Sequence, residues 1–375
     1  MQKKISLMII VCLLWMSPLT VKAYEELSVR KQYEAYMSRF ESIERFEDVE
    51  KNNYDVIEEQ SFPAVFESFG EQEVTFFTAM EENYNRLAVF LMDAEGKILY
   101  KTNHLETNNR IIGEMKQPTK EIAAVSFIDV NHDNLKDIIL ITRCVNDRGE
   151  YKGLQYKVGD VLFQAEGVFY RDYRISEKIN RFGMNKSARC IISFVRDGKS
   201  TEFLYTATTS QELLDNGLNI IEEQCYPRTF EKLGKLQVVP GTFSMGDYEV
   251  FMIYLINEQG NIVWSFQPME DYDNLYSLKG IGCKDLDGDG MKDLVVLARY
   301  SYETPNGELA VECNCSIYYQ RTGGFDEDRE FSKQFQCTNE HKLADIVQEI
   351  RKYWGWNTPE ETTTEILTET EQKIK

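Results

Sequence analysis

An internal duplication is the feature that most limits how this chain can fold. Residues 56–63 read VIEEQSFP, and residues 220–227 repeat this pattern as IIEEQCYP. Further along, residues 129–169 match residues 285–325 in the same order. Because each copy carries the same local signals, we expect two structural units with the same fold.

Both copies have the residue pattern of β-strands. Val, Ile, Phe and Tyr alternate with polar residues, and Gly, Asn and Asp separate the apolar runs. Residues 91–98 and their counterparts 255–262 place apolar runs on either side of an Asx-x-x-Gly turn, which predicts a hairpin in each copy. We therefore predict a mainly β fold made of a duplicated antiparallel β unit.

Amphipathic helices are predicted at both ends of the duplicated region. Apolar residues recur at helical spacing over roughly residues 26–50 and again over 343–353, where Gly355 is placed to end the helix. The predicted organisation is a signal peptide (1–23), an N-terminal helix (24–53), β unit 1 (54–205), β unit 2 (206–340), a C-terminal helix (341–356) and a disordered Thr/Glu-rich tail (357–375).

The first residues have the pattern of a secretory signal peptide. Lys3 and Lys4 precede an apolar run from Ile5 to Trp15, and small residues up to Ala23 offer a cleavage site. Since the apolar run is short for a membrane anchor, we expect cleavage after Ala23, with an uncleaved anchor as the alternative. The predicted location is therefore outside the cell or at its surface, with no membrane span after cleavage.

Charge and cysteine content narrow the possible partners and chemistry. With 62 acidic and 42 basic residues the formal net charge is −20, so we expect no nucleic-acid partner. The predicted export makes an extracellular protein or glycan the expected partner. Seven of the eight cysteines follow the signal peptide, and the sequence does not fix their pairing. Cys313 and Cys315 would lie on one face of a strand, as two small buried residues or as a site for metal or redox chemistry.

The clearest chemical signal is an acidic loop at residues 285–293, which read DLDGDGMKD. Carboxylates at alternate positions of a tight turn point to one side, and Ca²⁺ accepts about six to eight oxygen ligands with loose geometry. An EF-hand is excluded because Val296 stands where that motif needs a glutamate, and a strand-like run follows in place of a helix. The predicted calcium ligands are Asp285, Asp287, Asp289, the carbonyl oxygen of Met291, and Asp293.

The first copy has a related loop at residues 129–137, which read DVNHDNLKD. Asn131 offers a neutral oxygen in place of a carboxylate, so we expect weaker calcium binding than in the second copy. The predicted ligands are Asp129, Asn131, Asp133, the carbonyl oxygen of Leu135, and Asp137. For both loops the alternative is an acidic turn that holds no metal.

These loops and the strands around them resemble the FG-GAP and VCBS repeats of integrin-like β-propellers and of exported bacterial proteins. The resemblance is carried by DxDGDGxxD, the LVV strand that follows it, and a later strand ending in Gly-x-Phe at residues 317–325 and 161–169. It implies antiparallel blades, calcium in a loop between strands, and a role in binding or adhesion. Because the two loops, at 129–137 and 285–293, are too far apart for successive blades of a regular propeller, we predict an irregular β-propeller-like fold, with two β-sandwich-like domains as the alternative.

No catalytic motif stands out. The three histidines are widely separated, and the adjacent carboxylates Glu58 and Glu59, like Glu222 and Glu223, would point to opposite faces of a strand. We therefore predict an exported calcium-binding, non-enzymatic β-repeat protein that acts in binding or adhesion at the cell surface or outside the cell. The alternatives are a secreted glycan- or peptide-directed hydrolase with no recognisable motif, and a purely structural calcium-stabilised protein.

Overall fold

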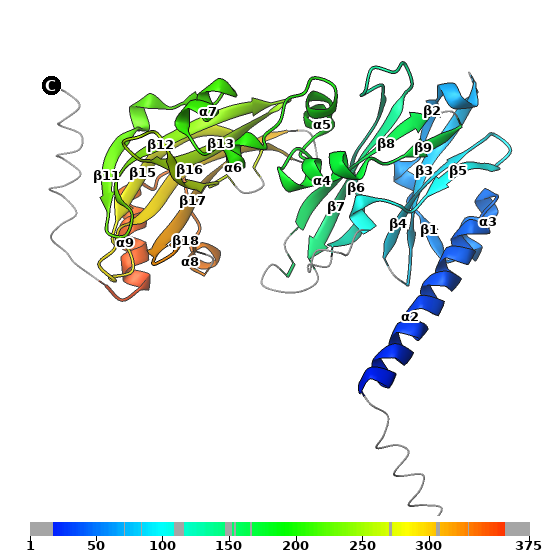
Figure 1. The fold of residues 1–375 in the computed structure, drawn as a ribbon, viewed down its shortest axis with the longest axis horizontal. Helices are drawn as coiled ribbons and strands as arrows, with labels where there is room; N and C mark the ends of the chain where they lie inside the picture. Colours follow the sequence, from blue (N-terminus) through cyan, green and yellow to red (C-terminus); the bar gives the residue numbers. More distant parts are fainter. Residues whose placement is uncertain are drawn as a thin grey trace, which may run out of the picture.

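The computed structural model describes residues 18–70, 72–83, 85–108, 116–146, 152–153, 155–165, 167–269, 272–304, 308–328 and 330–356. Residues 1–17 of the predicted signal peptide and the predicted tail at 357–375 lie outside these described residues. Strands account for 45% of the described residues and helices for 24%, which confirms the mainly β prediction. The two copies form two β-rich units (Figure 1).

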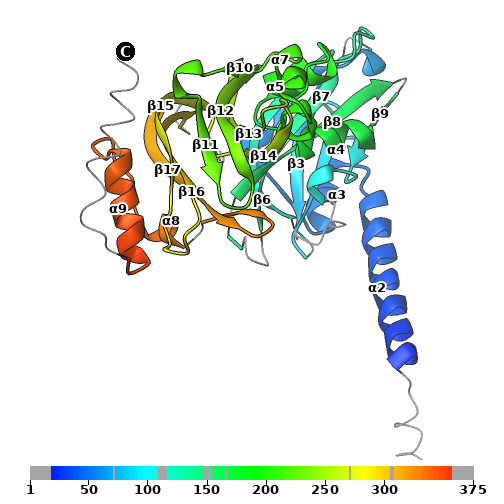
Figure 2. The ribbon, with the colours of Figure 1, turned by 60° about the vertical axis from the view of Figure 1, so that its left-hand side comes forward.

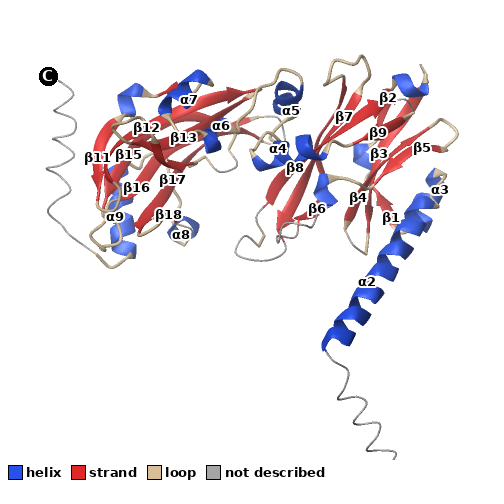
Figure 3. Ribbon diagram, in the orientation of Figure 1, coloured by secondary structure: helices blue, strands red, loops and turns tan. Residues whose placement is uncertain are grey.

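Antiparallel strands make up most of each unit (Figure 3). Those of the first unit are β1 (Tyr54–Val56), β2 (Phe62–Val65), β3 (Glu73–Glu81), β4 (Arg86–Met92), β5 (Ile98–Thr102), β6 (Lys116–Ile128), β7 (Asp137–Asn146), β8 (Gln155–Ala165) and β9 (Val168–Tyr170). Those of the second unit are β10 (Asn219–Ile220), β11 (Tyr226–Phe230), β12 (Gly234–Met245), β13 (Tyr248–Ile256), β14 (Ile262–Phe266), β15 (Asn274–Lys284), β16 (Asp293–Glu303), β17 (Leu309–Arg321) and β18 (Gly324–Glu327).

Helices precede, separate and follow the groups of strands. They are α2 (Pro18–Glu41), α3 (Phe46–Lys51), α4 (Tyr173–Arg181), α5 (Ala188–Val195), α6 (Phe203–Thr206), α7 (Ser210–Asp215), α8 (Phe331–Gln334) and α9 (Leu343–Tyr353), with short 3₁₀ helices η1 (Glu58–Gln60), η2 (Glu67–Phe69), η3 (Glu106–Asn108) and η4 (Glu222–Gln224). Figures 1 and 2 show the N-terminal part of α2 extending beyond the sheets. Among the described helices, none combines the length and the apolar character needed to cross a membrane.

Each unit contains the same two groups of paired strands. In the first unit, β1 to β5 form one sheet and β6 to β9 form the other. In the second unit, β10 to β14 and β15 to β18 repeat these pairings, and a parallel bridge between Glu249 and Asn274 joins them into one nine-stranded sheet. The sheet topology is therefore duplicated along with the sequence.

The two groups of strands in each unit pack face to face around one hydrophobic core. In the first unit, Phe76 and Val89 from the first sheet share a core with Leu140 from the second. In the second unit, Phe251 and Val296 belong to the equivalent core. Each unit therefore has the two-layer arrangement of the β-sandwich alternative.

Helices cover the outer faces of both sandwiches. In the first unit α2 and α3 pack on the β3–β4 face, and α4 and α5 pack on the β7–β8 face. In the second unit α6 and α7 cover the β12–β13 face, and α8 and α9 cover the β16–β17 face. The segments predicted as an N-terminal helix (24–53) and a C-terminal helix (341–356) thus contribute α2, α3 and α9 to the outer faces of the two units. Because Leu204 of α6 packs on the second unit, that unit begins before the predicted boundary at 205/206.

The helix predicted over 26–50 is interrupted in the structure. Residues 42–45 leave the helix because the Ile98 amide donates to the Glu44 carbonyl at 2.8 Å and Arg45 forms a bridge with Lys97. The same pairing recurs in the second copy, between Thr208 and Ile262 and between Thr209 and Asn261. The duplication therefore begins earlier than the sequence match indicates.

The C-terminal helix forms where it was predicted, but the two glutamate pairs do not lie in strands. Helix α9 spans Leu343–Tyr353 as predicted, and Gly355 ends it with φ 72° while the Trp356 amide donates to the Arg351 carbonyl at 2.8 Å. The glutamate pairs predicted to lie in strands instead lie in η1 and η4, where the chain turns between two strands.

Candidate functional site

The two acidic loops occupy equivalent places in the two units. The first acidic loop (residues 129–137) connects β6 to β7, and the second acidic loop (residues 285–293) connects β15 to β16. Both turn through two left-handed residues, with φ 64° at His132 and 67° at Asn134, and 84° at Gly288 and Gly290. Both copies therefore have the same loop conformation, although in the first copy two non-glycine residues must adopt an unfavourable positive φ.

Three predicted ligands converge in the second acidic loop. Carboxylate oxygens of Asp285, Asp287 and Asp289 lie within 4.8 Å of one another. Backbone amides orient them: Asp285 accepts from Gly288 and Gly290 at 2.8 and 2.9 Å. Asp289 accepts from Met291 at 2.8 Å. Since one hydrogen bond leaves each carboxylate oxygen another acceptor direction, this donor set fits a hard, oxygen-ligated cation such as Ca²⁺.

A positive side chain also contacts these carboxylates. Arg321, at the end of β17, donates to Asp287 at 2.8 Å and to Asp289 at 3.1 Å. This guanidinium already offsets part of the loop's negative charge. A divalent cation bound there would therefore share two carboxylates with Arg321 or displace it.

The aspartates at the ninth position of each loop have a different environment. Asp293 is fully buried and accepts from the Leu286 and Gln320 amides, both at 2.8 Å. Burial raises the pKa of Asp293 to about 7, with Asp287 and Asp289 contributing. Asp137 is equally buried and accepts from the Val130 and Gln164 amides at 2.9 and 2.8 Å. Both carboxylates thus join their loop to the neighbouring strand, and Asp293 is not part of the close aspartate group.

A second repeated network anchors each loop to the opposite sheet. In the second unit, Glu231 accepts from the Lys292 amide at 2.7 Å and from the Gln320 side chain at 3.2 Å. In the first unit, Glu67 accepts from the Lys136 amide and from the Gln164 side chain, both at 2.9 Å. These glutamates are not among the predicted site residues, although Phe66 and Phe230 directly before them are separated by the same 164 residues as the matched segments 56–63 and 220–227.

The first acidic loop is less suited to a cation. The side-chain amide of Asn131 donates to an Asp133 carboxylate oxygen at 2.9 Å, so this oxygen already has a hydrogen-bond partner within the loop. Asp129 accepts from the His132 and Asn134 amides at 2.7 and 2.9 Å. Because position 131 is an asparagine, positions 129, 131 and 133 supply two carboxylates, whereas the equivalent positions 285, 287 and 289 supply three.

The C-terminal helix covers one side of the second acidic loop. Arg351 donates twice to the Asp285 carbonyl, with both distances 3.0 Å. The Arg351 guanidinium also lies 4.4 Å from the ring centre of Trp356, and that ring faces the backbone of Gly288. The second loop is therefore enclosed by β17 on one side and by the end of α9 on the other.

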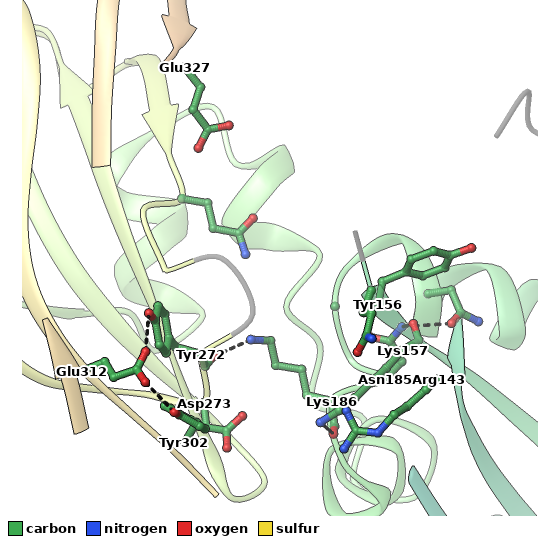
Figure 4. A pocket seen from close by; sticks show the side chains of 14 residues that line it. Arg143, Tyr156, Lys157, Asn185, Lys186, Tyr272, Asp273, Tyr302, Glu312 and Glu327 are labelled. Carbon is green, nitrogen blue, oxygen red and sulfur yellow. Dashed lines mark hydrogen bonds between the residues drawn. The ribbon is translucent and has the colours of Figure 1, made fainter. Parts of the chain in front are cut away.

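A cleft of about 740 Å³ lies between the two units (Figure 4). The first unit lines it mainly with basic and amide side chains, and the second mainly with aromatic and acidic ones. The Lys186 ammonium donates to the Tyr272 carbonyl at 2.6 Å, while Tyr272 and Tyr302 both donate to Glu312, at 3.2 and 2.6 Å. The sequence does not reveal this cleft, because its lining residues come from many separate segments of both copies. The labelled lining residues are Arg143, Tyr156, Lys157, Asn185, Lys186, Tyr272, Asp273, Tyr302, Glu312 and Glu327.

Comparison with known proteins identifies neither a family nor an activity for this chain. No family model and no curated protein matches the sequence. A solved structure described as an exotype rhamnogalacturonan lyase, YesX, aligns with 77% of this chain at 12% identity and a TM-score of 0.22. The aligned region covers 50% of that lyase chain. At this TM-score the similarity assigns neither a fold nor an activity to the present chain.

Proposed function

We propose that this chain is an exported, calcium-binding, non-enzymatic protein whose two β units together bind an extracellular glycan or protein. The convergence of Asp285, Asp287 and Asp289 within 4.8 Å carries the calcium part of the proposal. Three carboxylates at that separation repel one another, and Ca²⁺ in their midst would remove the repulsion. The signal-like pattern that ends at Ala23 supports export.

Calcium would act here as a structural ion. The second acidic loop contacts three separate parts of the unit: β17 through Arg321, the first sheet through Glu231 and α9 through Arg351. An ion that binds only the folded loop stabilises all of these contacts by mass action. The equivalent first loop would bind calcium more weakly, because Asn131 supplies no charge.

The cleft is the proposed binding surface. Its two walls carry opposite charge, with Lys157 and Lys186 on one side and Asp273 and Glu312 on the other. Tyr272 stacks on Tyr300 with ring centres 5.0 Å apart. Hydrogen bonds from Tyr272 to Glu312 and from Tyr300 to the Pro268 carbonyl fix the orientations of the two rings. Oriented aromatic faces beside charged groups suit polar ligands such as sugars or extended peptides.

The metal part is tested by titration calorimetry of the purified protein with Ca²⁺, with Mg²⁺ as the comparison ion. We expect binding of Ca²⁺ in the weak extracellular class, with a dissociation constant of about 0.1–1 mM, and a higher melting temperature in calcium than in EGTA. If the melting temperature is the same in Ca²⁺ and in EGTA, and titration with Ca²⁺ releases no binding heat, the chain does not bind calcium.

The ligand part is tested separately on glycan and peptide arrays, with product analysis of every positive ligand. Tyr302→Ala should abolish array binding, whereas Tyr276→Ala, an exposed tyrosine outside the cleft lining, should not. Cleavage of a bound ligand would favour the hydrolase alternative. Equal binding by both variants would place the ligand elsewhere on the surface.

A further inference from the structure

Three cysteines from two separate segments of the chain meet on the outer face of the second unit. Cys313 and Cys315 lie on β17, and Cys337 lies in the connection between α8 and α9. The sulfur atoms of Cys313 and Cys337 are 2.8 Å apart, which is closer than two unbonded sulfur atoms pack. The spacing of Cys313 and Cys315 predicts that these two lie on one face, but nothing in the sequence indicates that Cys337 joins them.

We propose that Cys313 and Cys337 form a disulfide that ties the α8–α9 connection to β17. In the reaction the two thiols together lose two protons and two electrons, and one S–S bond forms. The acceptor is a disulfide, either in a thiol–disulfide oxidoreductase or in a small molecule such as oxidised glutathione, and it is reduced to two thiols. The disulfide depends on the proposed function in one respect: export would place the chain in an oxidising environment, where disulfides persist.

Exposure favours Cys313 over Cys315 as the partner. Cys315 is only 3% exposed, whereas Cys313 and Cys337 are both half-buried and reachable by an oxidant. The Cys315 thiol also hydrogen bonds to Cys337, and together with burial this contact raises the Cys337 pKa. Cys315 would therefore remain as a buried thiol beside the bond.

The surroundings fit a structural bond better than a catalytic or metal site. Burial and the neighbouring Cys337 thiol raise the pKa of Cys313 to about 12, whereas catalytic cysteines have a lowered thiol pKa. Within the described residues, the group of three or more potential metal ligands with converging atoms is the aspartate group, and these cysteines are not in it. A covalent bond remains the simplest use of two sulfurs at this distance.

The position of the bond gives it a specific consequence. Cys337 comes shortly before α9, whose residues Ile346 and Ile350 pack on the outer face of β16 and β17. The same helix places Arg351 against the second acidic loop. A bond at Cys337 would therefore hold the start of the segment that covers this loop.

Peptide mapping tests the proposal without any variant. The purified full chain is equilibrated with oxidised glutathione, its remaining thiols are alkylated under denaturing conditions, and it is digested without reductant. We expect a fragment that links Cys313 to Cys337 and two fewer alkylated thiols than in the reduced protein. Complete alkylation of both cysteines, or a link from Cys337 to Cys315 or any other cysteine, would overturn the assigned pairing.

Matched variants connect the bond to stability. Reduction should lower the melting temperature of the wild-type protein by about 5 °C. Cys337→Ser should lose the cross-link, and reduction should then leave its melting temperature unchanged. Cys225→Ser, a partly buried cysteine outside the cluster, should keep both the cross-link and the effect of reduction. These measurements are made without calcium or ligand, so their failure would be distinct from failure of the proposed function.

Discussion

Arg321 lies 2.8 Å from Asp287 across the mouth of the second acidic loop. The residue at the equivalent position of the first unit is Ala165. The two copies therefore offset loop charge differently. The second copy keeps three carboxylates and adds a guanidinium, whereas the first replaces one carboxylate by the amide of Asn131.

Replacing Arg321 by glutamine should strengthen calcium binding. The guanidinium shares Asp287 and Asp289 with the proposed ion, so its removal would free both carboxylates. A gain of about 1 kcal/mol, or roughly fivefold in affinity, is the expected size for a partly exposed ion pair. Titration calorimetry measures it, with Arg196→Gln as a control that removes one charge far from the loop. Unchanged affinity in Arg321→Gln would mean that the two cations do not compete.

Asp285→Asn and Asp129→Asn form a matched pair of variants. Asp285 accepts two backbone amides of its own loop and Asp129 accepts three, so in EGTA each change should lower the free energy of unfolding by about 1–2 kcal/mol. In millimolar Ca²⁺, Asp285→Asn should cost about 1 kcal/mol more than Asp129→Asn. Denaturant unfolding in the two buffers gives all four values. If the two variants lose the same free energy of unfolding in Ca²⁺, the second acidic loop does not bind calcium more tightly than the first.

Glu231→Gln should alter stability in a pH-dependent way. Although partial burial opposes ionisation, the Lys292 side chain and amide lower the pKa of Glu231 to about 2. An unfolded glutamate has a pKa near 4.3, so the ionised form contributes stability above pH ~4.3, and that contribution is lost as the pH falls toward 2.

Because the Glu231 side chain is 32% exposed, we expect Glu231→Gln to cost about 1–2 kcal/mol at pH 7 and little at pH 2. Denaturant unfolding between these pH values measures the difference. Glu258→Gln is the control, because Glu258 pairs with Lys235 on the surface and should show no measurable loss at either pH. A loss in Glu231→Gln that is the same at both pH values would show that ionisation is not its cause.

Gly324→Ala should destabilise the second unit by about 2–4 kcal/mol. Gly324 has φ 147°, and an added methyl group would overlap three ring atoms of Trp264. The neighbouring Gly323 has no atom within 4 Å of that position, so Gly323→Ala should be close to neutral. Chemical denaturation of the two variants compares them directly. Similar stability in both would mean that the Trp264 ring can move aside.

The sequence predicts those features that depend on neighbouring residues. Strand alternation, the Asx-x-x-Gly hairpins and helix α9 are local patterns, and the structure has them at or near the predicted positions. The convergence of Asp285, Asp287 and Asp289 is also local, because alternate residues of one tight turn create it.

The remaining features depend on contacts between distant segments. The helix predicted over 26–50 breaks because residues 44 and 45 pair with the hairpin at 97–98. Glu231 reaches Gln320, and Cys337 reaches Cys313, only after the two sheets and their covering helices have assembled. The cleft requires both units. No periodicity or spacing in the sequence encodes these juxtapositions.

The packing of Trp356 on the backbone of Gly288 gives the second acidic loop a built-in optical probe. Indole emission responds to nearby charge, and the other two tryptophans of the described residues contact different groups. Trp264 packs against Phe325 in the sandwich core, and Trp354 donates to Tyr319. With Trp264 and Trp354 replaced by phenylalanine, fluorescence of the unlabelled chain would follow the charge state of this loop in real time.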